Sequence, residues 1–232
     1  MLRTLKDLEG YKIRATDGDV GSVVNFLLDD EHWTVRYLVA QTGAFFDRAR
    51  RLIPVISFRR CDWSTRHFHV SLSADKVLHA PSVDTDKPVS RQHERDQLRY
   101  YGRPSTRAHA SHAAGNAHLR SAHELHGYHV HGSDGTLGHV EDFIVDDETW
   151  QIRYLVVDTS VWWLGRRVLI APQWASRVSW AAREVHLSIS QKMIKDSPEW
   201  NATAPISREY EARLYDHYGR PVHWKNGKEV AL

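Results

Sequence analysis

The sequence contains a single cysteine, Cys61, among 232 residues, so no disulfide can form within the chain. No stretch approaches the roughly 18 apolar residues that a membrane-spanning helix needs. Residues 1–13 also lack the apolar core of a signal peptide. The formal net charge of +2 is too small to indicate a nucleic-acid partner by itself. These absences favour a soluble protein of a reducing compartment, and we expect it to be cytoplasmic.

Motifs of catalysis are also missing. The chain has no Walker phosphate loop, no G-x-G-x-x-G dinucleotide turn and no G-x-S-x-G nucleophile turn. We therefore predict no enzymatic activity, no catalytic residue and no cofactor.

What the sequence does contain is an internal repeat. Residues 17–42 recur 117 positions later as residues 134–159, with 14 of 26 aligned positions identical. The same register continues without a gap to a shared YGRP at residues 101–104 and 218–221. A repeat of this kind predicts two modules of one design. We place them at residues 1–104 (the first copy) and 119–224 (the second copy), with a His- and Ala-rich linker at 105–118 and a tail at 225–232.

Within each copy the local pattern is mainly β. Apolar and polar residues alternate over residues 11–16, and further apolar segments follow at 20–28, 33–40, 52–56 and 68–72. Asp17-Gly18 and Asp134-Gly135 are typical of tight turns, because glycine accepts positive φ. Five or six short sequential strands predict a small closed barrel, which leaves no exposed edge. Residues 90–101 and 207–218 predict a helix after each barrel, begun by a serine and ended by Gly-x-Pro. The predicted fold class is mainly β, with two tandem barrels related by a pseudo-twofold axis, each followed by a short C-terminal helix.

The motif D-G-x-x-G-x-V, followed by an acidic turn and W-x-[VI]-R-Y-L-V, resembles the PRC-barrel domain family. That family includes the cytoplasmic domain of the photosynthetic reaction centre H subunit, a domain of a ribosomal small-subunit maturation factor, and many uncharacterised bacterial proteins. The resemblance covers both copies. It implies a small β-barrel for each copy and a role as an adaptor that docks onto a larger complex. The chain lacks the membrane-spanning helix of the H subunit and the separate N-terminal domain of the ribosomal factor, so neither specific role is transferred.

Two groups of polar residues have features of a metal site. His109 and His112, like His123 and His126, have the spacing of ligands on one helical turn. Without cysteines or an H-E-x-x-H motif, a solvated linker is the favoured interpretation and a His-rich metal protein the alternative. The acidic turns at residues 29–31 and 146–148 offer oxygen ligands for a divalent cation, but they favour hairpin tips kept in water by their charge. We predict no metal site.

Two single residues have features of a reactive group. Ser73 and Lys76 match S-x-x-K, but the second copy lacks the lysine, so Ser73 is interpreted as the start of a short helix. Arg60 beside Cys61 would activate the thiol by lowering its pKa. The second copy has Val178 in place of Cys61, which favours a packing position instead.

The candidate interaction residues lie in one loop of each copy. Adjacent aromatic residues occur at equivalent positions of the two copies, and basic residues follow them: Phe45, Phe46, Trp162, Trp163, Arg166, Arg167. Trp and Arg are the residues that protein interfaces favour. Contact between modules, an external protein partner and RNA stacking are all compatible with the pattern, in that order of preference.

The function predicted from these features is a non-enzymatic adaptor that docks to an unknown protein complex, in one variant at the cytoplasmic membrane surface. An RNA- or ribosome-associated factor is the first alternative and a His-rich metal-binding protein the second. A homodimer of the whole chain stays open.

Overall fold

The structure is a computed structural model that describes residues 1–43, 49–82, 96–97, 99–102, 119–159, 166–222, 224–225 and 228–229. The predicted linker and both pairs of loop aromatics lie outside these residues. The chain divides into two compact units. Unit 1 contains Met1, Arg3–Leu125 and Val145–Ile152, and unit 2 contains Leu2, His126–Ile144 and Arg153–Leu232. The units follow the two copies only in part, because unit 1 takes in two segments of the second copy.

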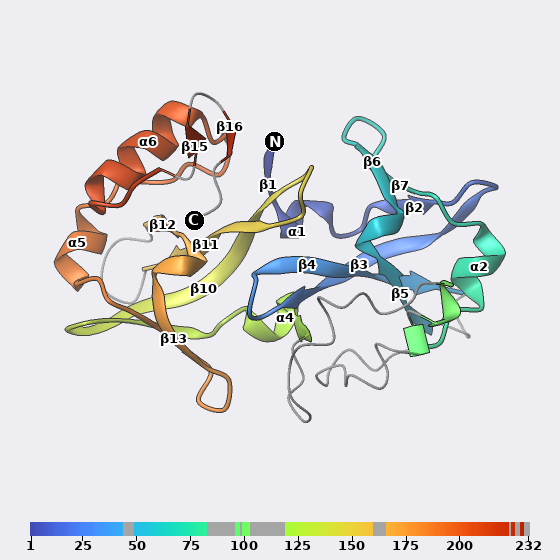
Figure 1. Cartoon of the computed structure of the whole chain (residues 1–232), viewed down its shortest axis with the longest axis horizontal. Coiled ribbons are helices and arrows are strands. Elements are labelled where there is room, and N and C mark those ends of the chain that lie inside the picture. Colours follow the sequence, from blue (N-terminus) through green and yellow to red (C-terminus); the bar gives the residue numbers. More distant parts are fainter. Residues whose placement is uncertain are drawn as a thin grey trace. The chain divides into compact units, whose positions relative to one another are not determined.

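The described residues of the first copy form seven strands with short helical turns between them (Figure 1). In chain order its elements are β1 (Leu2–Thr4), α1 (Leu5–Leu8), β2 (Lys12–Arg14), β3 (Asp19–Asp29), β4 (Thr34–Thr42), β5 (Ala49–Pro54), the 3₁₀ turn η1 (Val55–Ser57), β6 (Phe58–Asp62), β7 (His67–Val70) and α2 (Ala74–Leu78).

The second copy repeats this series, and its described residues also include a longer helix, α6. Its elements are β8 (Leu119–Ser121), α4 (Ala122–Leu125), β9 (His129–Gly132), β10 (Gly135–Asp146), β11 (Ile152–Asp158), β12 (Arg167–Ile170), the 3₁₀ turn η3 (Pro172–Trp174), β13 (Ala175–Ser179), β14 (Glu184–Leu187), α5 (Gln191–Lys195), α6 (Arg208–His217), β15 (Trp224–Lys225) and β16 (Lys228–Glu229). Each element from β8 to α5 therefore has a counterpart about 117 residues earlier, as the repeat predicted.

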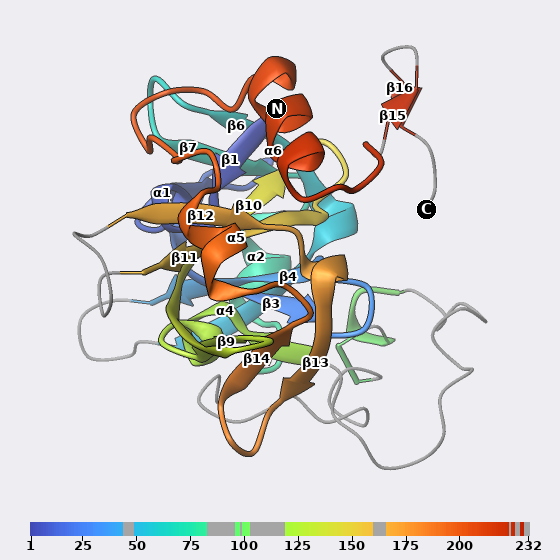
Figure 2. The same ribbon diagram turned by 90° about the vertical axis from the view of Figure 1, so that its left-hand side faces the viewer.

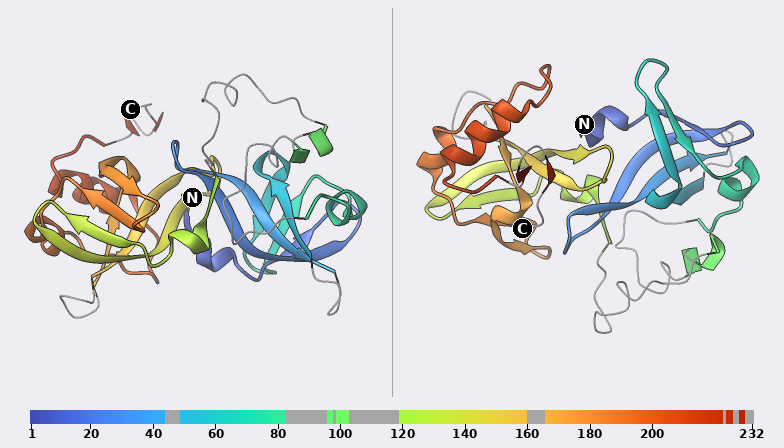
Figure 3. Two further views of the ribbon diagram at one scale, coloured as in Figure 1. Left: turned by 90° about the horizontal axis from the view of Figure 1, so that it is seen from below. Right: turned by 45° about the horizontal axis from the view of Figure 1, so that its top comes forward.

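The two main sheets have the same strand order. The first runs β5-β4-β3-β2-β7-β6, with β8 added beside β3, and the second contains the path β12-β11-β10-β9-β14-β13. Neighbours are antiparallel except β2 with β7 and β9 with β14, which are parallel. Figure 3 shows the strong twist of the long β3–β4 pair. The mainly β prediction is confirmed.

The closed barrel that the sequence predicted is not seen. In the described part of the chain, the end strands β5 and β6 do not pair with each other, nor do β12 and β13. The turn η1 connects β5 to β6, and η3 connects β12 to β13. Before each turn the chain pairs with β4 or β11, and after it with β7 or β14.

The core of unit 1 is completed by residues from the second copy. Leu119, on β8, joins a buried cluster whose other members come from β3, β4 and β5: Leu27, Tyr37, Val39, Leu52. A buried polar pair fixes β8 against β3, since the Asn25 Nδ2 donates to the Ser121 hydroxyl at 2.7 Å. Buried polar groups of this kind are costly unless they are paired, so this contact specifies the register.

The β10–β11 turn supplies the other inserted segment of unit 1. Trp150 is 8% exposed and lies among three phenylalanines, with ring centroids 6.3 Å from Phe26, 4.8 Å from Phe58 and 5.5 Å from Phe68. The Val35 amide donates to the Trp150 carbonyl at 2.8 Å, and the Ile152 amide donates to the Trp33 carbonyl at 2.7 Å. Thr34 bridges Gln151, its own counterpart in the repeat, so the two acidic turns meet through equivalent residues.

In unit 2, α6 lies alongside the β11–β12 end of the sheet (Figure 2). Ser207 caps it, its side chain accepting the Tyr210 amide, and the predicted helix over residues 207–218 corresponds to this element. Glu211, 1% exposed, accepts a 2.7 Å hydrogen bond from the Tyr154 hydroxyl on β11 and a 3.1 Å bond from the Arg208 Nη1. The first copy's predicted helix, residues 90–101, lies mostly outside the described residues.

Replacing Glu211 is expected to loosen α6 from the sheet. Burial raises the pKa of Glu211, while the bonds from Tyr154 and Arg208 oppose that rise. The raised pKa means that Glu211 contributes most to stability below its unfolded pKa, and this contribution is lost as the pH rises through the folded value. Glu211→Ala leaves the buried Tyr154 hydroxyl without its acceptor and should cost about 2–4 kcal/mol in urea unfolding. Glu211→Gln retains an acceptor and should cost about 1 kcal/mol, with a flatter dependence of stability on pH. Equal losses in the two variants would contradict this expectation, because they would show that the amide acceptor retained by Glu211→Gln contributes nothing to stability.

Candidate interaction site

The two aromatic loops close on equivalent threonines. In the second copy, the Thr159 amide and hydroxyl both donate to the Arg166 carbonyl, at 3.0 and 2.9 Å. In the first copy, the Thr42 hydroxyl donates to the Ala49 carbonyl at 3.2 Å. Thr42 is the last residue of β4, and Thr159 directly follows β11. The acceptor Ala49 is the first residue of β5, and the acceptor Arg166 directly precedes β12. The described residues on either side therefore fix both ends of each loop. Phe45, Phe46, Trp162 and Trp163 themselves lie outside the described residues.

Arg166, the first of the predicted interaction arginines, binds the backbone of its own unit. Its Nη1 donates to the Lys195 carbonyl at 2.6 Å and its Nη2 to the Ser197 carbonyl at 2.8 Å. In the first copy a different residue does the same work, because the Arg51 Nη1 donates to the Ala80 carbonyl at 2.6 Å. Ala80 and Ser197 are counterparts in the repeat, so each copy fixes the segment after its α2 or α5 with an arginine.

Arg167, the second predicted arginine, is paired within the sheet. Its Nε and Nη2 donate to the two carboxylate oxygens of Glu141 at 2.5 and 2.6 Å, a bidentate geometry. These hydrogen bonds raise the pKa of Arg167. The side chain is 45% exposed, so it remains accessible at the surface but with its charge balanced.

A small recess lies beside the base of the second aromatic loop. Its volume is about 390 Å³, which includes space that is open to solvent. Apolar side chains line it together with hydroxyl, amide and basic groups: Thr136, Leu137, Thr159, Arg166, Val168, Gln191, Ile194, Lys195. None of the described residues that line it is a carboxylate, histidine or cysteine. The exposed lining of the recess is mainly apolar, which suits contact with an apolar side chain.

In each acidic turn, the side chain of the first aspartate accepts hydrogen bonds from backbone amides of the same turn. The Asp29 Oδ1 accepts the amides of Glu31 and His32, each at 3.0 Å, and Asp146 makes the equivalent bonds to Glu148 and Thr149. Burial alone would raise the pKa of Asp29, but these backbone donors bring it below its ordinary value. The hairpin-tip interpretation accounts for these contacts.

The histidines give no metal centre within the part of the chain that is described. His123 Nε2 lies 2.7 Å from the Glu9 carboxylate. His109 and His112 lie outside the described residues. Among the residues that the structure places, no group of three or more His, Cys, Asp or Glu side chains is arranged to hold a metal ion.

Ser73 and Cys61 take structural positions. The Ser73 hydroxyl accepts the Lys76 amide and begins α2, which confirms the prediction of a helix start. The Lys76 ammonium donates to the Tyr100 carbonyl at 2.7 Å, so it does not act on the serine. The hypothesis that Arg60 activates Cys61 is wrong: burial, with Asp147 and Asp62 nearby, raises the pKa of the thiol to about 12.

Alkylation of Cys61 in the folded protein should therefore be slow. Because the thiolate is the nucleophile, a thiol with a pKa of about 12 should react with iodoacetamide at pH 8 roughly a thousandfold more slowly than a free cysteine. Mass spectrometry of modification against time measures the rate, and the urea-unfolded protein gives the free-thiol reference. Equal rates in the folded and unfolded protein would contradict the assigned environment.

Comparison with known proteins finds one family. The PRC-barrel domain model matches residues 118–185, which span β8 to the start of β14. No curated protein matches the chain. No helix among the described residues is long and apolar enough to cross a membrane.

Proposed function

We propose that the chain is a non-enzymatic adaptor of PRC-barrel type, which docks to a protein complex through the two aromatic loops. The observation that carries the proposal is the shared construction of those loops. In the sequence of each copy, adjacent aromatic residues stand between two strands whose facing ends are joined by a threonine hydrogen bond. A fixed frame reduces the entropy that is lost when a partner is bound.

The first copy is included in this proposal as a second module of the same type. The family model matches residues 118–185, within the second copy, and the repeat extends its motif to residues 17–42. The equivalent order of strands in the two sheets supports the same design for both. The proposal also includes a relation to the reaction centre H subunit and docking at the cytoplasmic membrane surface. Both of these parts are based on the shared motifs alone.

The contacts of the loop arginines favour a protein partner over RNA at this site. Arg166 directs its Nη1 and Nη2 at backbone carbonyls, and Arg167 is neutralised by Glu141. Phosphate binding relies on cations that face outward with unbalanced charge. The apolar recess beside the loop suits a hydrophobic side chain of a protein instead.

The experiment is an affinity capture with the full chain, compared with Trp162→Ala/Trp163→Ala. We expect the double variant to lose a specific set of captured proteins while its thermal unfolding midpoint changes little. Phe45→Ala/Phe46→Ala tests the first copy in the same way. If either variant unfolds, its aromatic pair is part of the core, and the docking role of that loop is rejected.

A further inference from the structure

A second surface, on unit 1, carries a concentration of positive charge. Strands β2, β6 and β7, with the turn that joins β6 to β7, contain five Lys or Arg residues and a single acidic residue, Asp62. Their formal charge is +4, whereas the whole chain has +2. All five cations are exposed, and we call them the basic face: Lys12, Arg14, Arg59, Arg60, Arg66.

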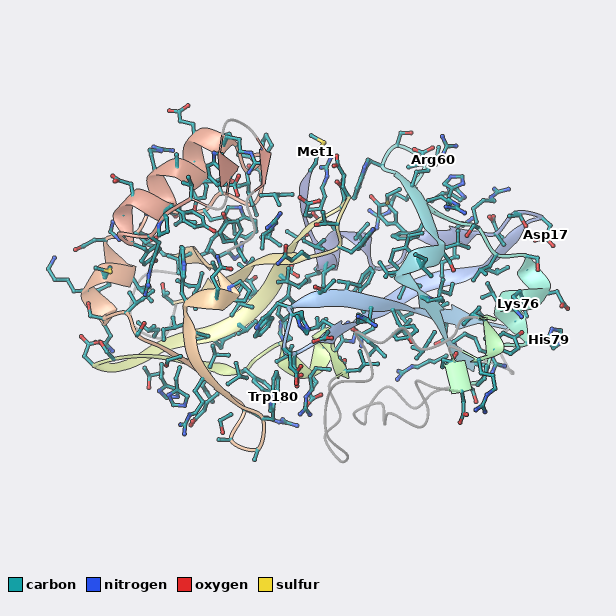
Figure 4. All side chains as sticks on the ribbon, in the orientation of Figure 1. Met1, Asp17, Arg60, Lys76, His79 and Trp180 are labelled. Carbon is teal, nitrogen blue, oxygen red and sulfur yellow. The ribbon has the colours of Figure 1, made fainter. Side chains whose placement is uncertain are left out.

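Strand register places most of these groups on one side of the sheet. His69 is paired with Arg14 on β2 and with Arg60 on β6, so the three form one row across the strands. Ile13 and Phe68, the intervening residues, are buried on the opposite side. Figure 4 shows Arg60 at the outer side of the β6–β7 hairpin.

The charge of the basic face is only partly balanced. Arg14 pairs with Asp19 at 2.6 Å. The Asp62 Oδ1 accepts bonds from the Ser64 amide and hydroxyl and from the Thr65 amide, so that oxygen is directed into the turn. Lys12, Arg59 and Arg60 form no ion pair with any described residue. Burial and the neighbouring Arg60 lower the pKa of His69, as expected in a positive field.

The second copy lacks this charge although it keeps the same strands. The counterparts of Lys12, Arg14 and Arg59 are His129, His131 and Ser176, and Glu184 stands where the first copy has His67. Only Arg60 and Arg66 are retained, as Arg177 and Arg183. The fold therefore does not require the extra cations, and a binding role would account for them.

The basic face borders an open edge of the sheet. β6 is an end strand, and within the described residues its strand pairing is with β7 alone. An edge strand presents unpaired amide and carbonyl groups that an extended peptide can join as an added strand. Acidic side chains on such a peptide would lie against Arg59 and Arg60.

We propose that the basic face and the β6 edge bind an extended acidic segment of a partner protein. The inference rests on the adaptor function proposed above and names a second contact, of opposite chemistry to the aromatic loops. Charge complementarity would speed the encounter, and the strand edge would fix the register of the bound segment.

The neighbouring aromatic rings favour an acidic peptide over RNA. The Arg3 guanidinium lies 4.3 Å above the Trp63 ring, and Arg66 lies 4.7 Å above the Tyr11 ring. Trp63 and Tyr11 also contact each other edge to face, with centroids 5.9 Å apart. Single-stranded RNA needs open ring faces for its bases, and an arginine already covers one face of each of these two rings.

Fluorescence anisotropy with the full chain tests the proposal. The probe is a labelled peptide of about twelve residues, alternating Glu and Val, which favours an extended strand. A peptide with Gln in place of Glu is the neutral control, and oligouridylate of similar length reports on RNA. The decisive variant is Arg60→Glu, and Arg177→Glu is its matched control at the equivalent position of the second copy. Circular dichroism verifies that both variants fold.

We expect Arg60→Glu to weaken binding of the Glu peptide about tenfold and Arg177→Glu to change it less than twofold. Raising the salt concentration should weaken the wild-type complex, and the Gln peptide should bind at least tenfold less tightly. Equal losses in the two variants, absence of binding to the Glu peptide, or tighter binding of RNA would each overturn the inference. Those results leave the aromatic loops unaffected, because the adaptor proposal is tested by the Trp162/Trp163 variant.

Discussion

Gly138→Ala is expected to prevent normal pairing of β10 with β11. Gly138 has φ +154°, and a Cβ built on it would lie 1.9 Å from the Asp158 carbonyl oxygen. Gly21, its counterpart, has φ +142° and would place a Cβ 2.0 Å from the Gln41 carbonyl oxygen. Both obstacles are backbone atoms of the neighbouring strand, so no side chain can move aside to relieve the overlap. Separation of the strands should cost about 3 kcal/mol or more.

Gly18→Ala is the matched control, because Gly18 belongs to the same motif in the first copy. An added Cβ there meets no atom within 4 Å. We expect this variant to unfold within about 0.5 kcal/mol of the wild type in urea. Gly21→Ala should resemble Gly138→Ala in unit 1. A Gly138→Ala protein with wild-type stability would show that the strand spacing at this position is wrong.

The second glycine of the D-G-x-x-G motif also helps to explain why much of the fold could be predicted from the sequence. In D-G-x-x-G the second glycine marks the site where two strands approach too closely for a side chain, and it recurs at Gly21 and Gly138. The repeat then predicted two equivalent sets of strands. Alternating residues 11–16 correspond to β2 and its flanks, and the apolar runs correspond to β3, β4, β5 and β7.

Strands β6 and β13 escaped prediction because they are edge strands. Each has exposed residues at two successive positions, Arg59-Arg60 and Ser176-Arg177, next to an irregularity in pairing. A bulge of this kind interrupts the period of two on which strand prediction depends.

The partners of the interaction arginines could not be predicted from the sequence, for a different reason. A basic run after two aromatics indicates a binding surface, but sequence cannot show that Arg166 finds acceptors near residue 195 or that Arg167 finds Glu141. These partners are distant in the chain and come together only through the fold. The basic face was missed for the same reason, since its charges lie on three strands and in one turn.

Trp150→Ala should destabilise unit 1, although Trp150 belongs to the second copy. The indole fills the space between Phe26, Phe58 and Phe68 and is 8% exposed. Removing a buried Trp leaves a cavity that rigid neighbours cannot close, at a cost of about 3–5 kcal/mol. A first module that ends at residue 104, as the repeat predicts, would leave Trp150 in the second module. The structure instead places Val145–Ile152 in unit 1.

The location of the damage distinguishes this expectation from a general loss of stability. Native-state hydrogen exchange should show faster exchange of amides on β3, β6 and β7, the strands that carry the three phenylalanines. Trp33→Ala is the control, because Trp33 occupies the equivalent turn position but is only partly buried; we expect it to cost less. If Trp150→Ala instead accelerated exchange only in unit 2, the turn at Val145–Ile152 would belong with its own copy, and the two units would follow the repeat after all.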